Sequence, residues 1–275
     1  MGLTNQQLYT TLNNGNQMPL LGLGVYDMHA AEAVHAVQYA LETGYRLIDT
    51  AAMYENEKQI GEGIRRSAIP RDEIFLTTKV NNTDQGYDET LKAFDKSLQE
   101  LNVGYIDMYL IHWPIKHQRK ETWKAIESLY RNKLVKNIGV ANYLLPFLQE
   151  LETYGTITPA INQMEFSPFL FMKEELDYCE QHNIVLQAYT PLVRGQKFNE
   201  PSVRELAEKY QKTPAQIILR WAVQQGISTI PKSSNPSRIQ ENFNIFDFEM
   251  DQPDILYMNT WNEDFRLVDN PLDML

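Results

Sequence analysis

The stretch Ile106-Asp107-Met108-Tyr109-Leu110-Ile111-His112, followed by a helical pattern over Lys120–Asn132, contains the unit from which this chain is built. Short runs rich in β-branched and apolar residues alternate with longer stretches of helical period. Eight such runs are present, at Leu20–Val25, Arg46–Thr50, Ile74–Val80, Ile106–His112, Val135–Ala141, Ala160–Phe166, Ile184–Thr190 and Ser228–Pro231. Eight β-then-α units in 275 residues predict one α/β domain over residues 1–275, folded as a closed parallel (β/α)8 TIM barrel.

An open, doubly wound sheet is the alternative fold for a chain with this alternation. That fold typically has a glycine-rich turn that leads from its first strand directly into a helix. Gly22-Leu23-Gly24 lies inside the first run, and no further glycine follows three residues later. The glycine pattern therefore favours the barrel.

Three local signals complete the expected architecture. Alternating residues on both sides of Asn13–Asn16 predict an N-terminal β-hairpin that caps the bottom of the barrel. In the seventh unit, Thr213 as N-cap and Pro214 as first residue start a second helix, within Lys209–Gln225. The tail Asp251–Leu275 has no clear period and is long enough to fold over the active-site mouth.

The composition excludes several classes of protein. Hydrophobic residues make up 43% of the chain, which is enough for a full core and too much for a disordered chain. The formal net charge of −11 argues against binding to nucleic acid or to an anionic membrane. Cys179 is the single cysteine, so we expect a packed thiol, no intramolecular disulfide, no cysteine-based zinc site and no metal.

The N-terminal residues point to the cytoplasm. Residues 1–7 contain no basic region and no apolar run, so we expect no signal peptide. Gln6 stands where a myristoylation motif beginning at Gly2 needs Ser or Thr. No stretch approaches the roughly 18 apolar residues of a transmembrane helix.

Four titratable residues fall at or just after three consecutive strand ends, where TIM barrels carry their functional side chains. They are Asp49, Tyr54, Lys79 and His112. Taken singly, each also has a purely structural interpretation. Asp49 could cap a helix or form an ion pair, and Tyr54 could pack over its loop. Lys79 could be an ordinary lysine at the rim, and His112 could be a buried core histidine. Their convergence on one mouth favours a catalytic site.

The chemistry of the four residues is coherent. A buried Lys79 needs a counter-charge, which Asp49 can supply. A cationic Lys79 beside Tyr54 would lower the phenol pKa from about 10 and make it a general acid at neutral pH. His112 could donate a hydrogen bond to a carbonyl oxygen. The set contains no hydride source, so a cofactor must provide one.

Six characteristic segments follow one another along the chain: Asp49-Thr50-Ala51-Ala52-Met53-Tyr54-Glu55-Asn56-Glu57, Thr78-Lys79, Leu110-Ile111-His112-Trp113-Pro114, Gly139-Val140-Ala141-Asn142-Tyr143, Asn162-Gln163-Met164-Glu165 and Ile230-Pro231-Lys232-Ser233. Through these segments the chain resembles the aldo-keto reductase family from about residue 8 to residue 250. It is most similar in pattern to short-loop bacterial and fungal members of the 2,5-diketo-gluconate reductase type, which reduce small keto and aldehyde compounds.

The resemblance implies a monomeric enzyme that binds NADP(H) and a small carbonyl substrate. Tyr54 would be the acid, Lys79 and Asp49 would adjust its pKa, and His112 would orient the substrate. Asn142 and Gln163 would bond to the nicotinamide carboxamide, and Tyr189 would stack on its ring. Arg194 would contact the pyrophosphate, and Thr190 and Leu192 are further expected cofactor contacts. Lys232, Ser233, Ser234, Asn235 and Arg238 would lie around the 2′-phosphate, and Glu241 and Asn242 would face the adenine.

Some positions depart from the family pattern. Ala141 replaces a serine that commonly joins Asn142, and Asn81-Asn82 replace an aromatic residue that often lines the pocket. The loop Thr190–Asn199 is short, which argues against a long strap over the pyrophosphate. We expect Tyr26, Asn81 and Trp113 to contact the substrate, together with tail residues such as Trp261 or Phe265. Arg266 could meet an acidic substrate, but we interpret it as a surface arginine.

The sequence therefore predicts NADPH-dependent reduction of aldehydes or ketones to alcohols. The sequence leaves two alternative functions open. One is a nucleotide-binding regulatory protein with little turnover, and the other is a Schiff-base aldolase that uses Lys79 as its nucleophile.

Overall fold

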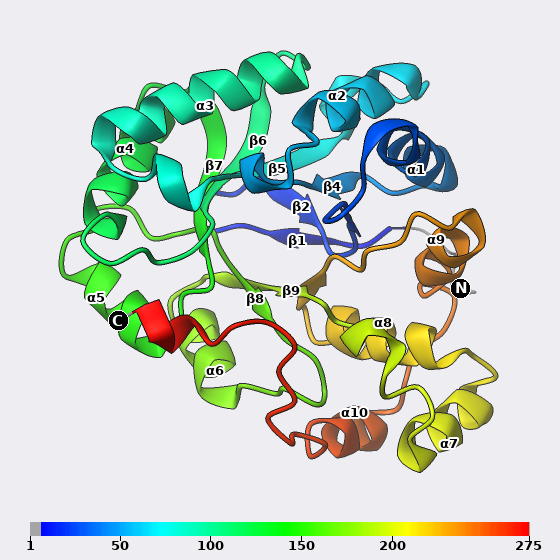
Figure 1. Cartoon of the computed structure of the whole chain (residues 1–275). Coiled ribbons are helices and arrows are strands. Elements are labelled where there is room, and N and C mark those ends of the chain that lie inside the picture. The colour runs from blue at the N-terminus through cyan, green and yellow to red at the C-terminus, as the bar shows by residue number, and fades with distance from the viewer. Residues whose placement is uncertain (1–6, 275) are drawn as a thin grey trace.

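The computed structural model describes residues 7–274, so the expectations for the N-terminal segment concern residues outside this range, apart from Gln7. Eight parallel strands lie in one sheet, in the spatial order β10-β9-β8-β7-β6-β5-β4-β3 (Figure 1). The strands are β3 Leu23–Gly24, β4 Leu47–Asp49, β5 Phe75–Val80, β6 Ile106–Ile111, β7 Val135–Ala141, β8 Ile161–Glu165, β9 Val185–Tyr189 and β10 Ser228–Thr229.

Backbone bonds close this sheet into a barrel. Parallel bridges join Leu21 to Thr229 and Gly24 to Lys232, so the first strand meets the last. The Thr229 amide donates to the Leu20 carbonyl at 2.8 Å, and the Gly22 amide donates to the Thr229 carbonyl at 2.9 Å. The (β/α)8 barrel predicted from the alternation is confirmed.

Helices surround the strands and bury an apolar layer between the two (Figure 1). Trp123, Trp221 and Phe94 are among the largest side chains that this layer buries completely. The α-helices are α1 Ala30–Thr43, α2 Glu57–Arg66, α3 Tyr87–Leu101, α4 Arg119–Arg131, α5 Leu145–Glu152, α6 Lys173–Gln181, α7 Pro201–Tyr210, α8 Pro214–Gln224, α9 Pro236–Phe243 and α10 Gln252–Met258. Short 3-10 turns are η1 Ala52–Tyr54, η2 Arg71–Glu73, η3 Asn82–Asp84, η4 Val193–Gly195 and η5 Pro271–Met274.

The seventh unit contains two helices, as predicted, but their boundaries differ from the expected ones. Thr213 caps α8 in a capping box, with its hydroxyl accepting from the Gln216 amide at 3.3 Å. The helical pattern seen from Lys209 onward is interrupted by Gln211, which has a left-handed φ of 53°. The residues before this break belong to α7.

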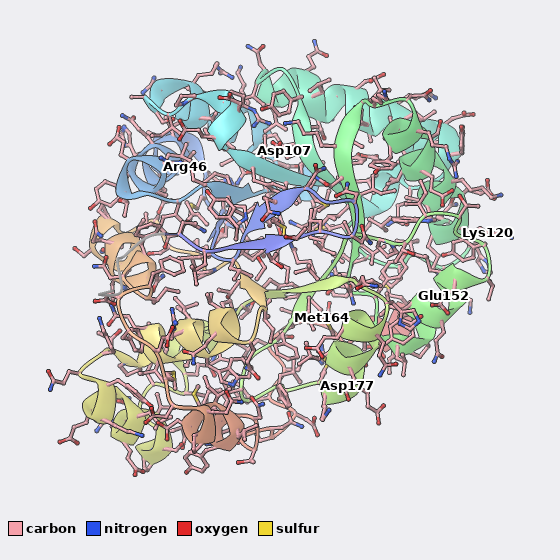
Figure 2. All side chains as sticks on the ribbon, turned by 180° about the vertical axis from the view of Figure 1, so that it is seen from behind. Arg46, Asp107, Lys120, Glu152, Met164 and Asp177 are labelled. Carbon is pink, nitrogen blue, oxygen red and sulfur yellow. The ribbon has the colours of Figure 1, made fainter. Side chains whose placement is uncertain are left out.

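The N-terminal hairpin caps the bottom of the barrel. Strands β1 Tyr9–Thr11 and β2 Gln17–Pro19 pair antiparallel. The side-chain amide of Asn13 donates to the Pro159 carbonyl at 3.0 Å, near the N-terminal end of β8. The side-chain amide of Asn14 donates to Asn137 Oδ1 at 2.8 Å, near the N-terminal end of β7. Figure 2 shows the hairpin from behind, lying across the barrel. The predicted cap is confirmed.

The C-terminal tail crosses the opposite end of the barrel (red in Figure 1). It contains the short helix α10, which the sequence pattern did not indicate. Beyond this helix, the Phe265 amide donates to the Phe169 carbonyl at 3.0 Å, and the Leu267 amide donates to Glu165 Oε1 at 2.6 Å. Because Glu165 ends β8, the tail covers this side of the mouth, as predicted.

Cys179 is completely buried, and burial raises the pKa of its thiol to about 12, which agrees with a packed, unreactive residue. None of the helices within residues 7–274 is long and apolar enough to cross a membrane.

Candidate active site

The alternation of side chains along the strands brings the catalytic candidates together. Successive residues of a strand point to opposite faces, so Asp49 shares the barrel interior with Leu47, which is packed inside the barrel. The same period places Lys79 and His112 inside, two residues after Thr77 and Leu110. Three neighbouring strands therefore direct polar side chains to one end of the interior.

Lys79 and Asp49 form a buried ion pair. Lys79 Nζ lies 2.6 Å from Asp49 Oδ1 and also donates to the Thr50 carbonyl at 2.9 Å. The Lys79 side chain is 0% exposed and that of Asp49 is 2% exposed. Burial raises the pKa of Asp49 and lowers the pKa of Lys79, and their mutual attraction opposes both shifts. The pairing expected from the sequence is present.

Tyr54 stands beside this pair. It ends the turn η1, and Glu55 follows with a left-handed φ of 53° that turns the chain toward α2. The Tyr54 ring centroid lies 5.3 Å from Lys79 Nζ, 5.2 Å from the ring of Tyr26 and 5.6 Å from the ring of His112. All four catalytic candidates are thus in one cluster.

The net shift of the Tyr54 pKa is upward, whereas the sequence predicted a lowered pKa. Desolvation raises the pKa of Tyr54 well above its ordinary value, and the negative charge of Asp49 adds to the increase. Lys79 does not reverse this shift, because its ammonium group is directed at Asp49 and Thr50. The phenol therefore stays protonated at neutral pH.

His112 is a buried, neutral imidazole. Desolvation lowers its pKa well below the ordinary value, and the Lys79 charge lowers it further. Its Nδ1 atom has no hydrogen-bond partner in residues 7–274. A neutral imidazole carries one N–H group and can donate one hydrogen bond to a carbonyl oxygen.

The two amide residues expected at the nicotinamide are hydrogen-bonded to other residues of the candidate site. Gln163 Nε2 donates to Asp49 Oδ2 at 2.7 Å and to Gln187 Oε1 at 2.7 Å. Asn142 Nδ2 donates to the His112 carbonyl at 2.9 Å, and the Tyr189 hydroxyl donates to Asn142 Oδ1 at 2.8 Å. Gln163 is therefore held by the ion pair, and Asn142 is held by the His112 backbone and by Tyr189.

Gln187 was not identified from the sequence. It is 0% exposed and connects Gln163 to Ser228, to which its amide donates at 3.0 Å. The strand period could have found it, because Gln187 stands two residues before Tyr189 and so points to the same side.

The start of α9 offers a cationic surface. Asn235 caps the helix by accepting a bond from the Arg238 amide at 3.2 Å. Lys232 and Arg238 are exposed, and neither is paired with a carboxylate in the part of the chain described. Two free cations at a helix N-terminus suit a phosphate group.

The other cofactor candidates differ in accessibility. Ser233 is 7% exposed, and its hydroxyl accepts the Asn235 amide at 3.2 Å, so it already shapes the turn. Asn242 is only 4% exposed. Arg194 is exposed, whereas half-buried side chains are found at Thr190, Leu192, Ser234 and Glu241.

The residues expected around the substrate lie at the open rim. Tyr26 is 60% exposed and meets Tyr54 edge to face. Asn81 and Trp113 are half-buried. In the tail, Trp261 stacks on Phe169 with ring centroids 5.8 Å apart.

Arg266 is not a surface arginine. Its side chain is 20% exposed, and Nη1 lies 3.7 Å from Glu165 Oε2. The carboxylate of Glu165 also accepts hydrogen bonds from the backbone amides of Leu267 and Val268, at 2.6 and 3.2 Å. The sequence contained Glu165 in a recognisable segment, but its pairing with a tail more than 100 residues away could not be inferred.

Comparison with known proteins agrees with this architecture. The model of the Aldo/keto reductase family matches residues 20–263. The chain is 47% identical to glyoxal reductase of Bacillus subtilis over 96% of both chains. It is 40% identical to methylglyoxal reductase DkgA of Escherichia coli, over 94% of this chain and 95% of that one. A mutant of Gox0644 in complex with NADPH has a TM-score of 0.92 and 36% identity, covering 97% of this chain and 98% of its own. The chain therefore belongs to the aldo/keto reductase family.

Proposed function

We propose that the protein reduces aldehydes or ketones to alcohols, with NADPH as reductant and Tyr54 as the proton donor. The observation that carries this proposal is the buried ion pair of Lys79 and Asp49 next to the Tyr54 ring, at the mouth of the barrel. Family membership and a relative in complex with NADPH support the choice of reaction and reductant.

The protein's own groups have distinct tasks in this proposal. Tyr54 holds the proton until the carbonyl oxygen gains negative charge, because desolvation keeps its phenol protonated. His112 donates a hydrogen bond to the same oxygen and fixes its direction. Lys79 provides a positive charge near the phenol, which favours the phenolate left after the proton is transferred.

The residues present suit NADPH. Asn142 and Gln163 have amide groups that match a carboxamide, and Tyr189 has a flat ring for stacking. Lys232 and Arg238 would take the 2′-phosphate at the start of α9. When bound, NADPH supplies the hydride that the side chains of the site do not contain.

A small dicarbonyl compound is the substrate class that we propose. Two of the relatives are named as reductases of glyoxal and methylglyoxal. Asn81 gives the rim of the pocket a polar side chain where an aromatic one would favour flat, apolar substrates.

The Schiff-base alternative is disfavoured by the surroundings of Lys79. A nucleophilic amine must be neutral and accessible to a carbonyl carbon. Lys79 Nζ is completely buried, and it already donates to Asp49 and to the Thr50 carbonyl.

The proposed reaction is tested by following NADPH absorbance with glyoxal, methylglyoxal, α-keto esters, simple aldehydes and keto-sugars. We expect turnover with several of them and the highest kcat/KM with a dicarbonyl. Stoichiometric binding of NADPH without turnover over the whole panel would contradict the proposal and favour the regulatory alternative.

Removing the charge of Lys232 should reveal the 2′-phosphate contact. Lys232→Ala is expected to raise the KM for NADPH by about 10-fold or more, because a charge-assisted hydrogen bond contributes about 1.5–3 kcal/mol. The KM for NADH should change by less than about twofold, since NADH lacks this phosphate. Lys173→Ala, in the exposed pair on α6, is the matched control. Equal increases for both cofactors would remove Lys232 from the phosphate site.

The pH dependence follows from the two shifted groups. The pKa of Tyr54 is raised and that of His112 is lowered, so both keep their proposed protonation states through neutral pH. We expect kcat for reduction to stay level from about pH 6.5 to about pH 10, the ordinary values of the two groups. Alcohol oxidation should rise with pH over this range, because it needs Tyr54 to accept a proton. A fall in the reduction kcat near neutral pH would contradict these assignments.

A further inference from the structure

Asn56 occupies a helix N-cap but does not cap. It precedes the first residue of α2, where an Asn side chain ordinarily accepts a bond from an amide of the first turn. No such bond is formed here. Since the cap would stabilise the helix, the side chain must be held elsewhere by stronger interactions.

The side-chain amide of Asn56 connects three segments. Its Nδ2 donates to the Val25 carbonyl at 2.9 Å and to the Met28 carbonyl at 3.0 Å. Its Oδ1 accepts the Thr50 hydroxyl at 2.7 Å. The residue is 1% exposed, so these bonds are shielded from water.

Each connection ends next to a group of the candidate active site. Val25 and Met28 bracket the loop that carries Tyr26, whose ring contacts Tyr54. The carbonyl of Thr50 accepts the bond from Lys79 Nζ. Asn56 itself follows Tyr54 by two residues in the chain.

We propose that Asn56 is a positioning residue that holds the Tyr54 turn and the Tyr26 loop in register with the Lys79–Asp49 pair. This inference rests on the proposed reduction, in which Tyr54 must meet the carbonyl oxygen within hydrogen-bond distance. Proton transfer is sensitive to such placement, and a displacement of about 1 Å can cost about 100-fold in rate.

An amide is required because the site needs two donors and one acceptor from a single short side chain. Serine supplies one donor and keeps the ability to cap a helix. Asn56→Ser therefore removes at least one of the two bonds to the Val25 and Met28 carbonyls while allowing the missing cap of α2 to form. Thr50→Val removes only the bond to Asn56 Oδ1 and leaves the Thr50 carbonyl available to Lys79.

The first measurement compares kcat with cofactor binding. We expect Asn56→Ser to lower kcat by about 10-fold or more, because proton transfer is sensitive to the placement of Tyr54. The Kd for NADPH should change by less than about twofold. Thr50→Val should also lower kcat, but by a smaller factor. It tests the positioning role of Asn56 if Asn56→Ser does not fold. Thr213→Ala is the control, since it removes the capping box of α8, remote from the site, and should lower Tm with no change in kcat.

Hydrogen exchange provides a measurement that needs no turnover. Asn56→Ser should speed amide exchange in residues 25–28 and at Tyr54 and Glu55, whose amides bond within η1. Thr213→Ala should leave these segments unchanged. An unaltered kcat, or unaltered exchange in the Tyr26 loop, would overturn the positioning role. A wild-type chain that oxidises no NADPH would instead contradict the proposed reduction, and the exchange result would still decide whether Asn56 holds the two loops.

Discussion

Tyr54→Phe is expected to lower kcat for carbonyl reduction by about 10²–10⁴-fold, the usual contribution of a positioned general acid. The substitution removes only the hydroxyl, so the ring can keep its contacts with Tyr26, His112 and Lys79. For the same reason, the Kd for NADPH should change by less than about twofold. Steady-state kinetics and a fluorescence titration with NADPH measure the two quantities.

A matched control separates loss of the proton donor from loss of a tyrosine in general. Tyr9→Phe alters an exposed residue of the hairpin, at the opposite end of the barrel, and should leave kcat unchanged. If Tyr54→Phe retained full activity, the proton would have to come from another group, and the proposed role of Tyr54 would be wrong.

Asp49→Asn is expected to reduce the free energy of unfolding by about 3–5 kcal/mol, because it leaves the Lys79 charge buried without a counter-charge. Activity should fall as well, since Lys79 will tend to lose its proton and the amide of Gln163 will lose a carboxylate acceptor. Urea denaturation and kcat are the two measurements.

The double variant Asp49→Asn with Lys79→Met gives the sharper test. Removing both charges should restore most of the lost stability, because no unpaired charge remains, whereas activity should stay low. Asp177→Asn breaks the exposed Lys173–Asp177 pair on α6 and should change stability by less than about 1 kcal/mol. A single Asp49→Asn variant as stable as the wild type would show that the buried pair is not held as an ion pair.

The fold was largely predictable because its signals are local. The strand runs, the Asn-Gly hairpin and the Thr213-Pro214 helix start all depend on neighbours within a few residues. Two helix assignments were imprecise for the same reason. The break at Gln211 lies between two helical patterns, and α10 is too short to show a clear period.

The convergence of Asp49, Tyr54, Lys79 and His112 was predictable because strand ends of a barrel meet at one mouth. What the sequence could not provide was the degree of burial, and burial sets the direction of the Tyr54 pKa. It also could not reveal Gln187 as a bridge or Glu165 as the anchor of the tail. Such contacts join segments far apart in the chain, and no local pattern specifies them.

The closure of the barrel has a consequence for how the chain can fold. One edge of the first barrel strand pairs with β4, but on the other edge Leu21 pairs with Thr229, and Ser228 donates to the Pro19 carbonyl across 209 residues. During synthesis, one edge of the first barrel strand therefore remains unpaired until nearly the whole chain has been made. Contacts of such long sequence separation slow folding, and unpaired edges favour aggregation. The seam between β3 and β10 is thus the last part of the barrel to form and the step at which a partly made chain is most exposed to misassembly.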